Sequence, residues 1–529
     1  MNDMDLHPME PAPDTLNPPW LAPLRRYVPL AVWGIVLMTL LLIPLKIMQY
    51  GYLPGDDALR SAGKAVSGKT WPEVLVLNDV YVMDHEFGWS ALLSGVEAVG
   101  HADTDGIVFF SVVSLFVLAG LAAVLWMRYP EAWLATLALS MIVVMAPYRF
   151  LQGRPYIITI AALLSLLFLW RRYGREKPRG WMAAAMTGWM AASVYLHGAW
   201  YLWVLLIAAF FLAGQFRWGF TVAVCWVAGV FLGSLLTGHL IGYPLQAVKV
   251  VMLATGKHFT QRTLAAELQP QNGDIHAMYI FGGLVVMRRL AGLKSPPFLR
   301  DPGFWLAGIS WLLSFRVARF WLDWGWPAFM ILVACDVQAL MGLRMAADSF
   351  RRLGFAAGFA LLAFLSITGD VGGRWTNNLT QAYLTADNPD LKGWLPDKGG
   401  ILYSTDMTVF YQTFYKNPHG DWRYMLGFEP TLMPAADFEV YHSILWNYGD
   451  ARTYTPWLLK MKAADRLVLR GARSTPPGLP ELEWNYGVSG LWVGRVPGQR
   501  PDGAPPTIRA TAKMTVLTNT PSVGMPGQK

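Results

Sequence analysis

Acidic side chains near the start of the chain are spaced so that they could act as a base. Asp56 and Asp57 follow a Pro-Gly turn, and about 27 residues later Asp84 and Glu86 flank His85. A carboxylate within hydrogen-bond reach of a hydroxyl can take its proton while that hydroxyl attacks another atom. Ionised groups beside an apolar layer cost free energy unless they face water, a partner or a substrate. The two clusters therefore predict the acidic half of an active site, with Asp57, Asp56, Asp84 and Glu86 as its catalytic residues.

Helix capping is the alternative interpretation of both clusters. The segment after Asp57 has a helical pattern, and so has the segment after Glu86, so these carboxylates could cap helix N-termini. Capping does not exclude chemistry, because one residue can cap while its neighbour reacts. Both clusters fall in one loop between two apolar runs. That shared position favours chemistry.

Basic side chains in two other loops could meet a phosphate group. Arg149 and Arg154 bracket a short stretch between apolar runs, and Lys257 and Arg262 belong to the longer loop 239–274. Guanidinium forks bind phosphate oxygens with two parallel hydrogen bonds. For the arginine pair, contact with lipid headgroups at the membrane surface is the alternative. We predict that these four residues bind the phosphate of a group-transfer donor.

The sequence leaves metal binding open. Carboxylates with one histidine could hold a Mg²⁺ or Mn²⁺ ion, whereas no Cys/His spacing indicates zinc. His197 is predicted to pack at a helix end beside Tyr195 and Trp200, with a role as metal ligand as the alternative. Arg316, Arg319 and Asp323 flank the end of a predicted span and are predicted to form a simple ion pair. The cofactor therefore stays unassigned.

The composition places these side chains in a membrane protein. Of the 529 residues, 54% are hydrophobic and only 15% are charged, whereas a globular domain carries about 25% charged residues. The net charge of +8 comes mainly from short Arg/Lys clusters between apolar runs. Membrane topology explains these clusters, so membrane lipid is an expected partner and nucleic acid is not. Cys225 and Cys335 both fall within apolar runs, so no disulfide framework is expected.

Apolar runs of spanning length divide most of the chain. We predict about eleven membrane-spanning helices, over residues 29–50, 106–127, 131–148, 155–170, 181–196, 199–214, 219–238, 275–290, 303–318, 326–343 and 353–369. The basic clusters, beginning with Arg25 and Arg26, fall on one side of this alternating path. By the positive-inside rule that side is cytoplasmic. The N-terminus is then inside, and the chain after about residue 370 lies outside.

The predicted organisation is a polytopic all-α membrane domain followed by a smaller α/β domain. Its parts are a disordered cytoplasmic tail (1–28), the membrane domain (29–370) with a large first outer loop (51–105), an exoplasmic, periplasmic α/β domain (371–497) and a flexible tail (498–529). Short loops and the lack of a processing signal point to a bacterial inner membrane.

Within the C-terminal part, alternating and helical patterns predict individual elements. A strand over Ile401–Ser404 is followed by an amphipathic helix, the stretch DRLVLRG forms another strand, and LEWNYGVSGLWVGRV forms a hairpin. In the helix, Phe410 and Phe414 share a face toward the core. Tyr411 and Tyr415, together with Trp422, are predicted to contact a glycan. The domain would thus guide an acceptor.

This layout resembles the GT-C glycosyltransferases, and in particular the protein O-mannosyltransferases and the aminoarabinose transferases of lipid A. The resemblance rests on Asp56 and Asp57 at the start of the first outer loop and extends more loosely to Asp84 and Glu86. In place of Asp84-His85-Glu86 many relatives carry a His-Pro-Pro-like stretch, so the sequence departs from the family pattern there.

The resemblance implies a fold and a reaction. It implies transfer of a sugar from a polyprenyl-phosphate-linked donor to a lipid, glycan or protein acceptor on the exoplasmic side. A first-loop carboxylate would act as the base or position the acceptor. Some members of the superfamily use a divalent cation and others do not.

Two other functions fit a polytopic membrane protein. A secondary transporter would place its ionisable residues within spans, whereas here they lie mostly in loops. A non-catalytic partner in envelope polysaccharide assembly or export would keep the topology without needing the acidic pair. An enzyme requires Asp57 to converge with Arg149 and Arg154 on one cavity.

Overall fold

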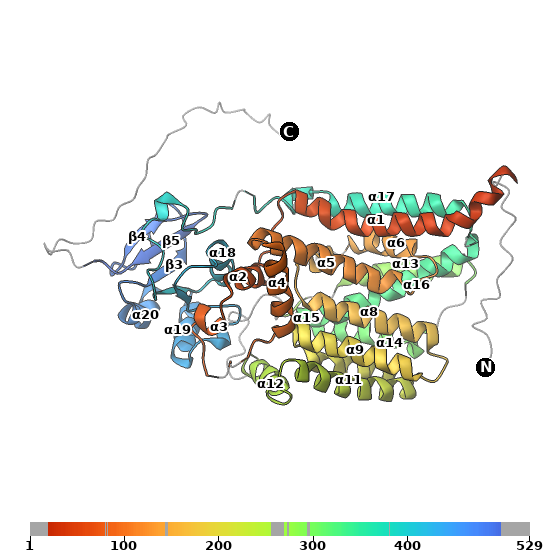
Figure 1. Ribbon diagram of the computed structural model, residues 1–529, viewed down its shortest axis with the longest axis horizontal. Coiled ribbons are helices and arrows are strands. Elements are labelled where there is room, and N and C mark those ends of the chain that lie inside the picture. Colours follow the sequence, from red (N-terminus) through yellow and green to blue (C-terminus); the bar gives the residue numbers. More distant parts are fainter. Residues whose placement is uncertain are drawn as a thin grey trace, which may run out of the picture.

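The protein is described by a computed structural model that covers residues 19–79, 81, 83–142, 146–254, 269–271, 274–293, 297–346, 348–379 and 381–498. It is elongated, with a bundle of long helices at one end and a small sheet with its own helices at the other (Figure 1). The helices α2 and α4, which follow the first long helix, lie between these two parts (Figure 1).

Six helical segments of the described chain are long and apolar enough to cross a membrane. They contain α1 (Val28–Gln49), α5 (Thr104–Val124), α8 (Tyr156–Tyr173), α11 (Phe216–Leu236), α16 (Trp326–Arg344) and α17 (Arg351–Thr368). The other predicted runs are also helical but shorter or less apolar: α6 (Glu131–Ser140), α9 (Gly180–His197), α10 (Val204–Leu212), α13 (Ile275–Leu290) and α14 (Pro302–Ser314). A mostly helical membrane domain is thus confirmed, and the number of eleven spans stays a prediction.

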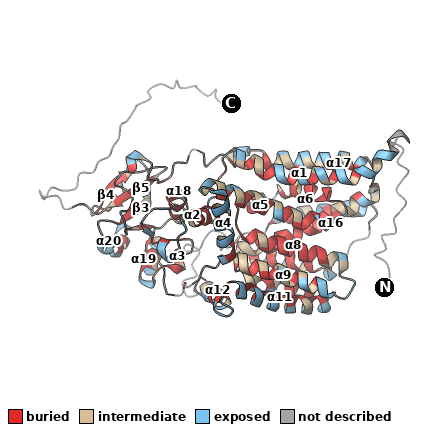
Figure 2. Ribbon diagram, viewed as in Figure 1, coloured by how far each residue is buried: buried red, intermediate tan, exposed pale blue. Residues whose placement is uncertain are grey.

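The bundle buries its centre and exposes apolar side chains at its edge. Helix α8 packs between α5 and α9, and most of its residues are buried (Figure 2). At the edge, α11 exposes Phe220, Val224 and Leu235. Large apolar residues exposed along a long helix mark a surface that faces lipid.

Ion pairs connect helices inside the bundle. Arg352 in α17 donates from Nε to Glu131 Oε1 in α6 at 2.7 Å, and both side chains are almost completely buried. Arg288 in α13 likewise donates from Nη1 to Asp336 in α16 at 2.8 Å. These charges lie within helices, whereas the sequence predicted that ionisable residues lie mostly in loops, which speaks against a transporter. Because each charge meets a partner of opposite sign, the pairs serve to join helices.

The first outer loop is itself helical. It contains α2 (Asp57–Ser67), α3 (Trp71–Val74) and α4 (Phe87–Gly100). Helix α2 ends at Gly68, whose left-handed φ of 66° costs a glycine little. α2 packs against α4 and α5 on one side and against α18 (Met407–Lys416) of the C-terminal part on the other.

The C-terminal part is built on a mixed five-stranded sheet of order β2-β1-β3-β5-β4. Its strands are β1 (Ile401–Ser404), β2 (Arg423–Tyr424), β3 (Arg466–Arg470), β4 (Glu483–Tyr486) and β5 (Leu491–Arg495), and its helices include α18, α19 (Ala435–Trp446) and α20 (Thr455–Lys460). β1 runs parallel to β2 and β3, and β5 runs antiparallel to β3 and β4. The predicted first strand, its helix, the DRLVLRG strand and the hairpin are confirmed. The two-residue β2 carries too little pattern to be predicted.

Helix α18 joins the two parts of the molecule. Phe410 and Phe414 are buried and surround Trp71 of α3, as their predicted core role requires. Tyr411 and Tyr415 are also buried, and the Tyr415 hydroxyl donates to Asp105 in the first turn of α5. The prediction that these tyrosines contact a glycan is wrong, because α18 turns them toward the protein.

Candidate active site

Arg154 joins the acidic pair of the first loop to the start of α8. Its Nε donates to Asp56 Oδ1 at 2.8 Å, its Nη2 donates to Asp56 Oδ2, and its Nε lies 3.6 Å from Asp57 Oδ2. The guanidinium is 9% exposed, whereas the two carboxylates are 23% and 22% exposed. Asp56 occupies the N-cap position of α2, yet its side chain makes no capping hydrogen bond. The capping interpretation is therefore wrong for Asp56, and its carboxylate serves the ion pair.

Gly153 makes this contact sterically possible. Its φ is +63°, and a Cβ at this position would lie 3.2 Å from Ala58 of α2 and 3.1 Å from Val112 of α5. Only glycine lets the backbone before α8 approach the first loop this closely. This close approach places Arg154 beside Asp56.

Arg60 links the two acidic clusters. In a helix, residues three apart share a face, and Arg60 Nε donates to Asp57 Oδ1 at 2.8 Å. Its Nη2 donates to Glu86 Oε1 at 2.9 Å, and the side chain is 2% exposed. The guanidinium lies over the ring of Phe428, 4.2 Å from its centroid, a favourable cation–π arrangement. Arg60 was not among the site residues predicted from the sequence, although its spacing from Asp57 was a usable signal.

Asp84 forms an ion pair with Lys64 of the same helix, α2. Lys64, one turn beyond Arg60, donates to Asp84 Oδ2, and Ser90 donates to the same oxygen at 2.8 Å. Burial raises the pKa of Asp84, but the charges of Lys64 and His85 and the hydrogen bonds from Lys64 and Glu86 N together hold that pKa well below its usual value. Asp84 is therefore ionised at any physiological pH.

The pKa of Glu86 is shifted in the opposite direction to that of Asp84. Burial raises the pKa of Glu86 to about 7, with the positive charge of Arg60 opposing the shift and the negative charges of Asp57 and Asp84 adding to it. Glu86 stands at the N-cap position of α4 without a side-chain capping bond, so the capping interpretation is wrong here too. A carboxyl group that titrates near neutrality suits a site that handles protons.

Arg149 lies in a second buried ion cluster. Its Nε donates to Asp323 Oδ1 at 2.7 Å, and Arg319 Nε donates to Asp323 Oδ2 at 2.9 Å. Asp323 belongs to the short turn η5 (Trp321–Gly325) before α16. Of the ion pair predicted among Arg316, Arg319 and Asp323, the contact between Arg319 and Asp323 is confirmed, and Arg149 joins it. Lys257 and Arg262, the other two predicted phosphate ligands, lie outside the described residues.

Tyr411 of α18 is a residue of the C-terminal part that lies near the acidic site. Burial, together with the negative charge of nearby Asp57, raises the pKa of its phenol. The side chain is 7% exposed. Tyr411 is more than 350 residues from Asp57 in the chain, so no local pattern could have predicted this proximity.

Metal ligands do not gather in this site. Among the residues that the structure describes, no three His, Cys, Asp or Glu side chains are grouped so as to hold a metal ion. The first-loop carboxylates face Arg60, Lys64 and Arg154 instead. His197 ends α9 as predicted, with Nδ1 bonded to Thr159 Oγ1 at 3.0 Å. Cations of the protein itself thus hold the acidic groups in place.

Comparison with known proteins finds solved structures that are similar to this chain, among them an oligosaccharyltransferase and ArnT. No protein-family model and no curated protein matches the chain. The oligosaccharyltransferase of Archaeoglobus fulgidus, solved with a tethered acceptor peptide, is 14% identical over 85% of this chain and 70% of its own, with a TM-score of 0.42. ArnT from Cupriavidus metallidurans in the apo state is 14% identical over 90% of this chain and 97% of its own, with a TM-score of 0.48.

Both structures are only 14% identical to this chain, with TM-scores below 0.5. The case for function therefore rests on the geometry of the site.

Proposed function

We propose that this protein is a membrane glycosyltransferase that moves a sugar from a polyprenyl-phosphate-linked donor to an acceptor on the exoplasmic side. The observation that carries the proposal is the contact of Asp56 and Asp57 with Arg154. It joins partly exposed carboxylates to a guanidinium at the end of a membrane helix. A base and a phosphate ligand are the two groups that such a transfer needs.

The reaction assigns a role to each group. The acceptor hydroxyl attacks the anomeric carbon, the bond from that carbon to the phosphate oxygen breaks, and the hydroxyl proton passes to a carboxylate. We assign Asp57 as the base. Arg60 Nε holds its Oδ1 at 2.8 Å and its Oδ2 lies 3.6 Å from Arg154 Nε, whereas both oxygens of Asp56 accept hydrogen bonds from Arg154. The leaving phosphate keeps the electron pair, and Arg154 stabilises its growing negative charge. Arg149 is a further candidate for the donor phosphate, as are Lys257 and Arg262.

The proposal includes the predicted topology. The first loop and the C-terminal domain lie on the same side of the membrane, because α2 packs against α18. About eleven spans, with the N-terminus in the cytoplasm of a bacterium, would put both in the periplasm. The acceptor is a lipid, a glycan or a protein.

Turnover of a lipid-linked sugar tests this function. The purified chain, reconstituted in liposomes, would be given polyprenyl-phosphate-linked pentoses and hexoses, and the loss of the sugar-linked lipid would be measured by mass spectrometry. We expect at least one donor to be consumed in the presence of a membrane extract that supplies acceptors. A transporter or an assembly partner would leave every donor intact, and that result would reject the proposal.

A further inference from the structure

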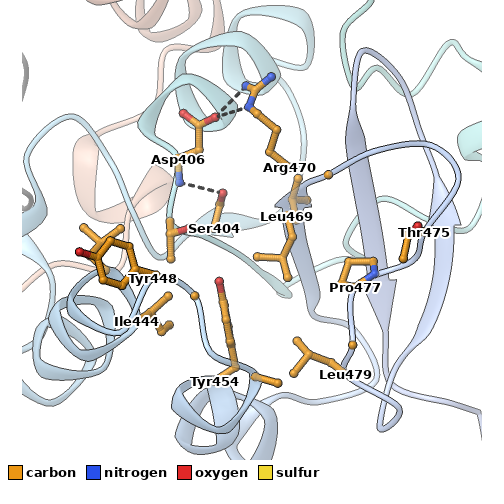
Figure 3. Close-up of a pocket in the computed structure, with 17 residues that line it drawn as sticks. Ser404, Asp406, Ile444, Tyr448, Tyr454, Leu469, Arg470, Thr475, Pro477 and Leu479 are labelled. Carbon is orange, nitrogen blue, oxygen red and sulfur yellow. Dashed lines mark hydrogen bonds and ion pairs between the residues drawn. The ribbon is translucent and has the colours of Figure 1, made fainter.

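A cavity of about 440 Å³ lies in the sheet domain, apart from the acidic site (Figure 3). It is at the carboxyl ends of the parallel strands β1 and β3. Ser404, Thr405 and Asp406 line it where β1 ends, and Arg470 and Gly471 line it where β3 ends. Ligands of α/β sheets bind in this position, outside the carboxyl ends of the strands, and the volume is typical of ligand pockets.

The cavity has one apolar and one polar wall. Ile444, Tyr454 and Leu479 contribute apolar surface. Opposite them, Ser404 and Asp406 lie beside Arg470 (Figure 3). A ligand that fits must therefore combine an apolar face with several hydrogen-bonding groups.

The charges of the polar wall neutralise each other. Arg470 donates to Asp406 Oδ2 from Nη2 at 2.7 Å and from Nε at 3.1 Å. The guanidinium is 51% exposed and the carboxylate 30% exposed, so both can still contact a ligand. Asp406 also caps α18 by accepting from Thr408 N at 2.9 Å. This carboxylate occupies the position at the helix start that would favour an anion, so a phosphate is disfavoured and hydroxyl groups are suited.

Tyr448 at the cavity has an unusual backbone. Its φ is +55°, in the left-handed region, and its side chain is 82% exposed. It belongs to the C-cap of α19: Gly449 N donates to Ile444 O at 2.8 Å and Tyr448 N donates to Leu445 O at 3.4 Å. A left-handed residue is common at this position of a helix end. The cap leaves the exposed Tyr448 ring in the lining of the cavity.

We propose that this cavity binds a neutral hexopyranose unit of a glycan, with the sugar ring against Tyr448 and its hydroxyls bonded to Asp406 and Arg470. The C–H face of a pyranose is apolar and packs against an aromatic ring. Its hydroxyls donate to a carboxylate and accept from a guanidinium without bringing a net charge.

The position of the cavity connects it to the acidic site. Asp406 precedes α18, and Tyr411 of the same helix lies near Asp57. Five residues of helix rise by about 7–8 Å, so α18 runs from the cavity toward the acidic site. Binding itself does not depend on the proposed transferase activity, and under that activity the cavity would hold a glycan acceptor.

Binding of methyl hexopyranosides to the full-length protein tests the proposal. Saturation-transfer NMR and calorimetry would use the methyl glycosides of glucose, galactose and mannose, with glucose 6-phosphate as the anionic comparison. The detergent must be free of sugar headgroups, which would compete. We expect millimolar or tighter binding of at least one neutral glycoside and weaker binding of the phosphate. Tighter binding of glucose 6-phosphate, or no binding of any neutral glycoside, would overturn the proposal.

Variants of Tyr448 separate binding from folding. Tyr448→Gly removes the ring and suits the left-handed backbone, so the melting temperature should not fall while affinity drops about tenfold. Tyr448→Trp should retain binding, and Trp446→Ala, an exposed aromatic residue outside the cavity lining, should leave it unchanged. Unaltered affinity in Tyr448→Gly would contradict the assignment. Asp57→Asn should bind the glycoside normally, so failure here and failure of the transferase proposal are distinguishable.

Discussion

At the scale of single residues, Asp57 lies between two guanidiniums. The buried Arg60 donates to one oxygen of Asp57, and Arg154 approaches the other oxygen from the start of α8. An incoming phosphate can compete with the carboxylates for Arg154, because phosphate and carboxylate both suit its fork. Arg60 is almost fully enclosed, so it is better suited to hold Asp57 in position. The two arginines therefore have different roles, and variants can separate them.

Arg154→Lys should weaken donor binding while preserving the fold. The substitution retains the charge but loses the two parallel hydrogen bonds. We expect the KM for the donor lipid to rise about tenfold, a loss of about 1.4 kcal/mol, with a near-normal melting temperature. Arg452→Lys, at a side chain 90% exposed, is the matched control and should change neither quantity. An unchanged KM for the donor in Arg154→Lys would contradict the assignment.

Glu86 should make stability depend on pH near neutrality. Burial raises its pKa in the folded protein to about 7, above that of an unfolded glutamate, so the folded state favours the protonated form. Its stabilising contribution is complete below the unfolded pKa and is lost as the pH rises through about 7. The melting temperature should therefore fall between about pH 5 and pH 8. Glu86→Gln, which stays neutral, should flatten this decline, and an identical decline in the variant would show that another group is responsible.

At the scale of elements, the close packing of α2 on α18 fixes the site. A Cβ on Gly63 would lie 3.0 Å from the Phe414 ring and 3.2 Å from the Phe414 carbonyl oxygen. Glycine thus permits the approach that places Tyr411 near Asp57. A displacement of α18 would disturb both the acidic site and the start of the glycan cavity.

Gly63→Ala should destabilise the protein by about 1–3 kcal/mol through overpacking. Gly95→Ala is its control, because Gly95 lies in α4 with no atom within 4 Å of the added Cβ, and there alanine should stabilise the helix by about 0.5–1 kcal/mol. Thermal unfolding of both variants measures the difference. Equal melting temperatures would indicate that α2 and α18 are not tightly packed.

At the scale of the whole molecule, the local sequence pattern predicted the helices and strands better than the contacts between them. The apolar runs became helices, and the β1–α18 unit and the β4–β5 hairpin have their predicted positions. The three-residue spacing of Asp57 and Arg60 could also have been recognised in the sequence. The proximity of Tyr411 to Asp57 and the pairing of Arg149 with Asp323 could not be recognised there, because residues far apart in the chain leave no shared local signal. Burial of Tyr415 depends on the same long-range packing.

The proposed topology can be tested with introduced cysteines. Asp103→Cys and Lys398→Cys should react with a membrane-impermeant maleimide in intact spheroplasts, because both positions are exposed and predicted to be outside. Lys177→Cys, exposed between α8 and α9, should react only after permeabilisation. The parent chain controls for Cys225 and Cys335. Labelling of position 177 in intact spheroplasts would contradict the orientation.

The most direct test of the central claim is sugar transfer by Asp57→Asn. Asparagine keeps the size of the side chain and can still bond Arg60, but it cannot accept the acceptor proton. Asp103→Asn is the control, because Asp103 caps α5 by accepting from Gly106 N and asparagine caps equally well. With both variants purified at normal yield and melting temperature, we expect Asp57→Asn to bind the donor lipid but transfer sugar about 10²–10⁴-fold more slowly, and Asp103→Asn to be fully active. Full activity of Asp57→Asn would contradict the assignment of this carboxylate as the base.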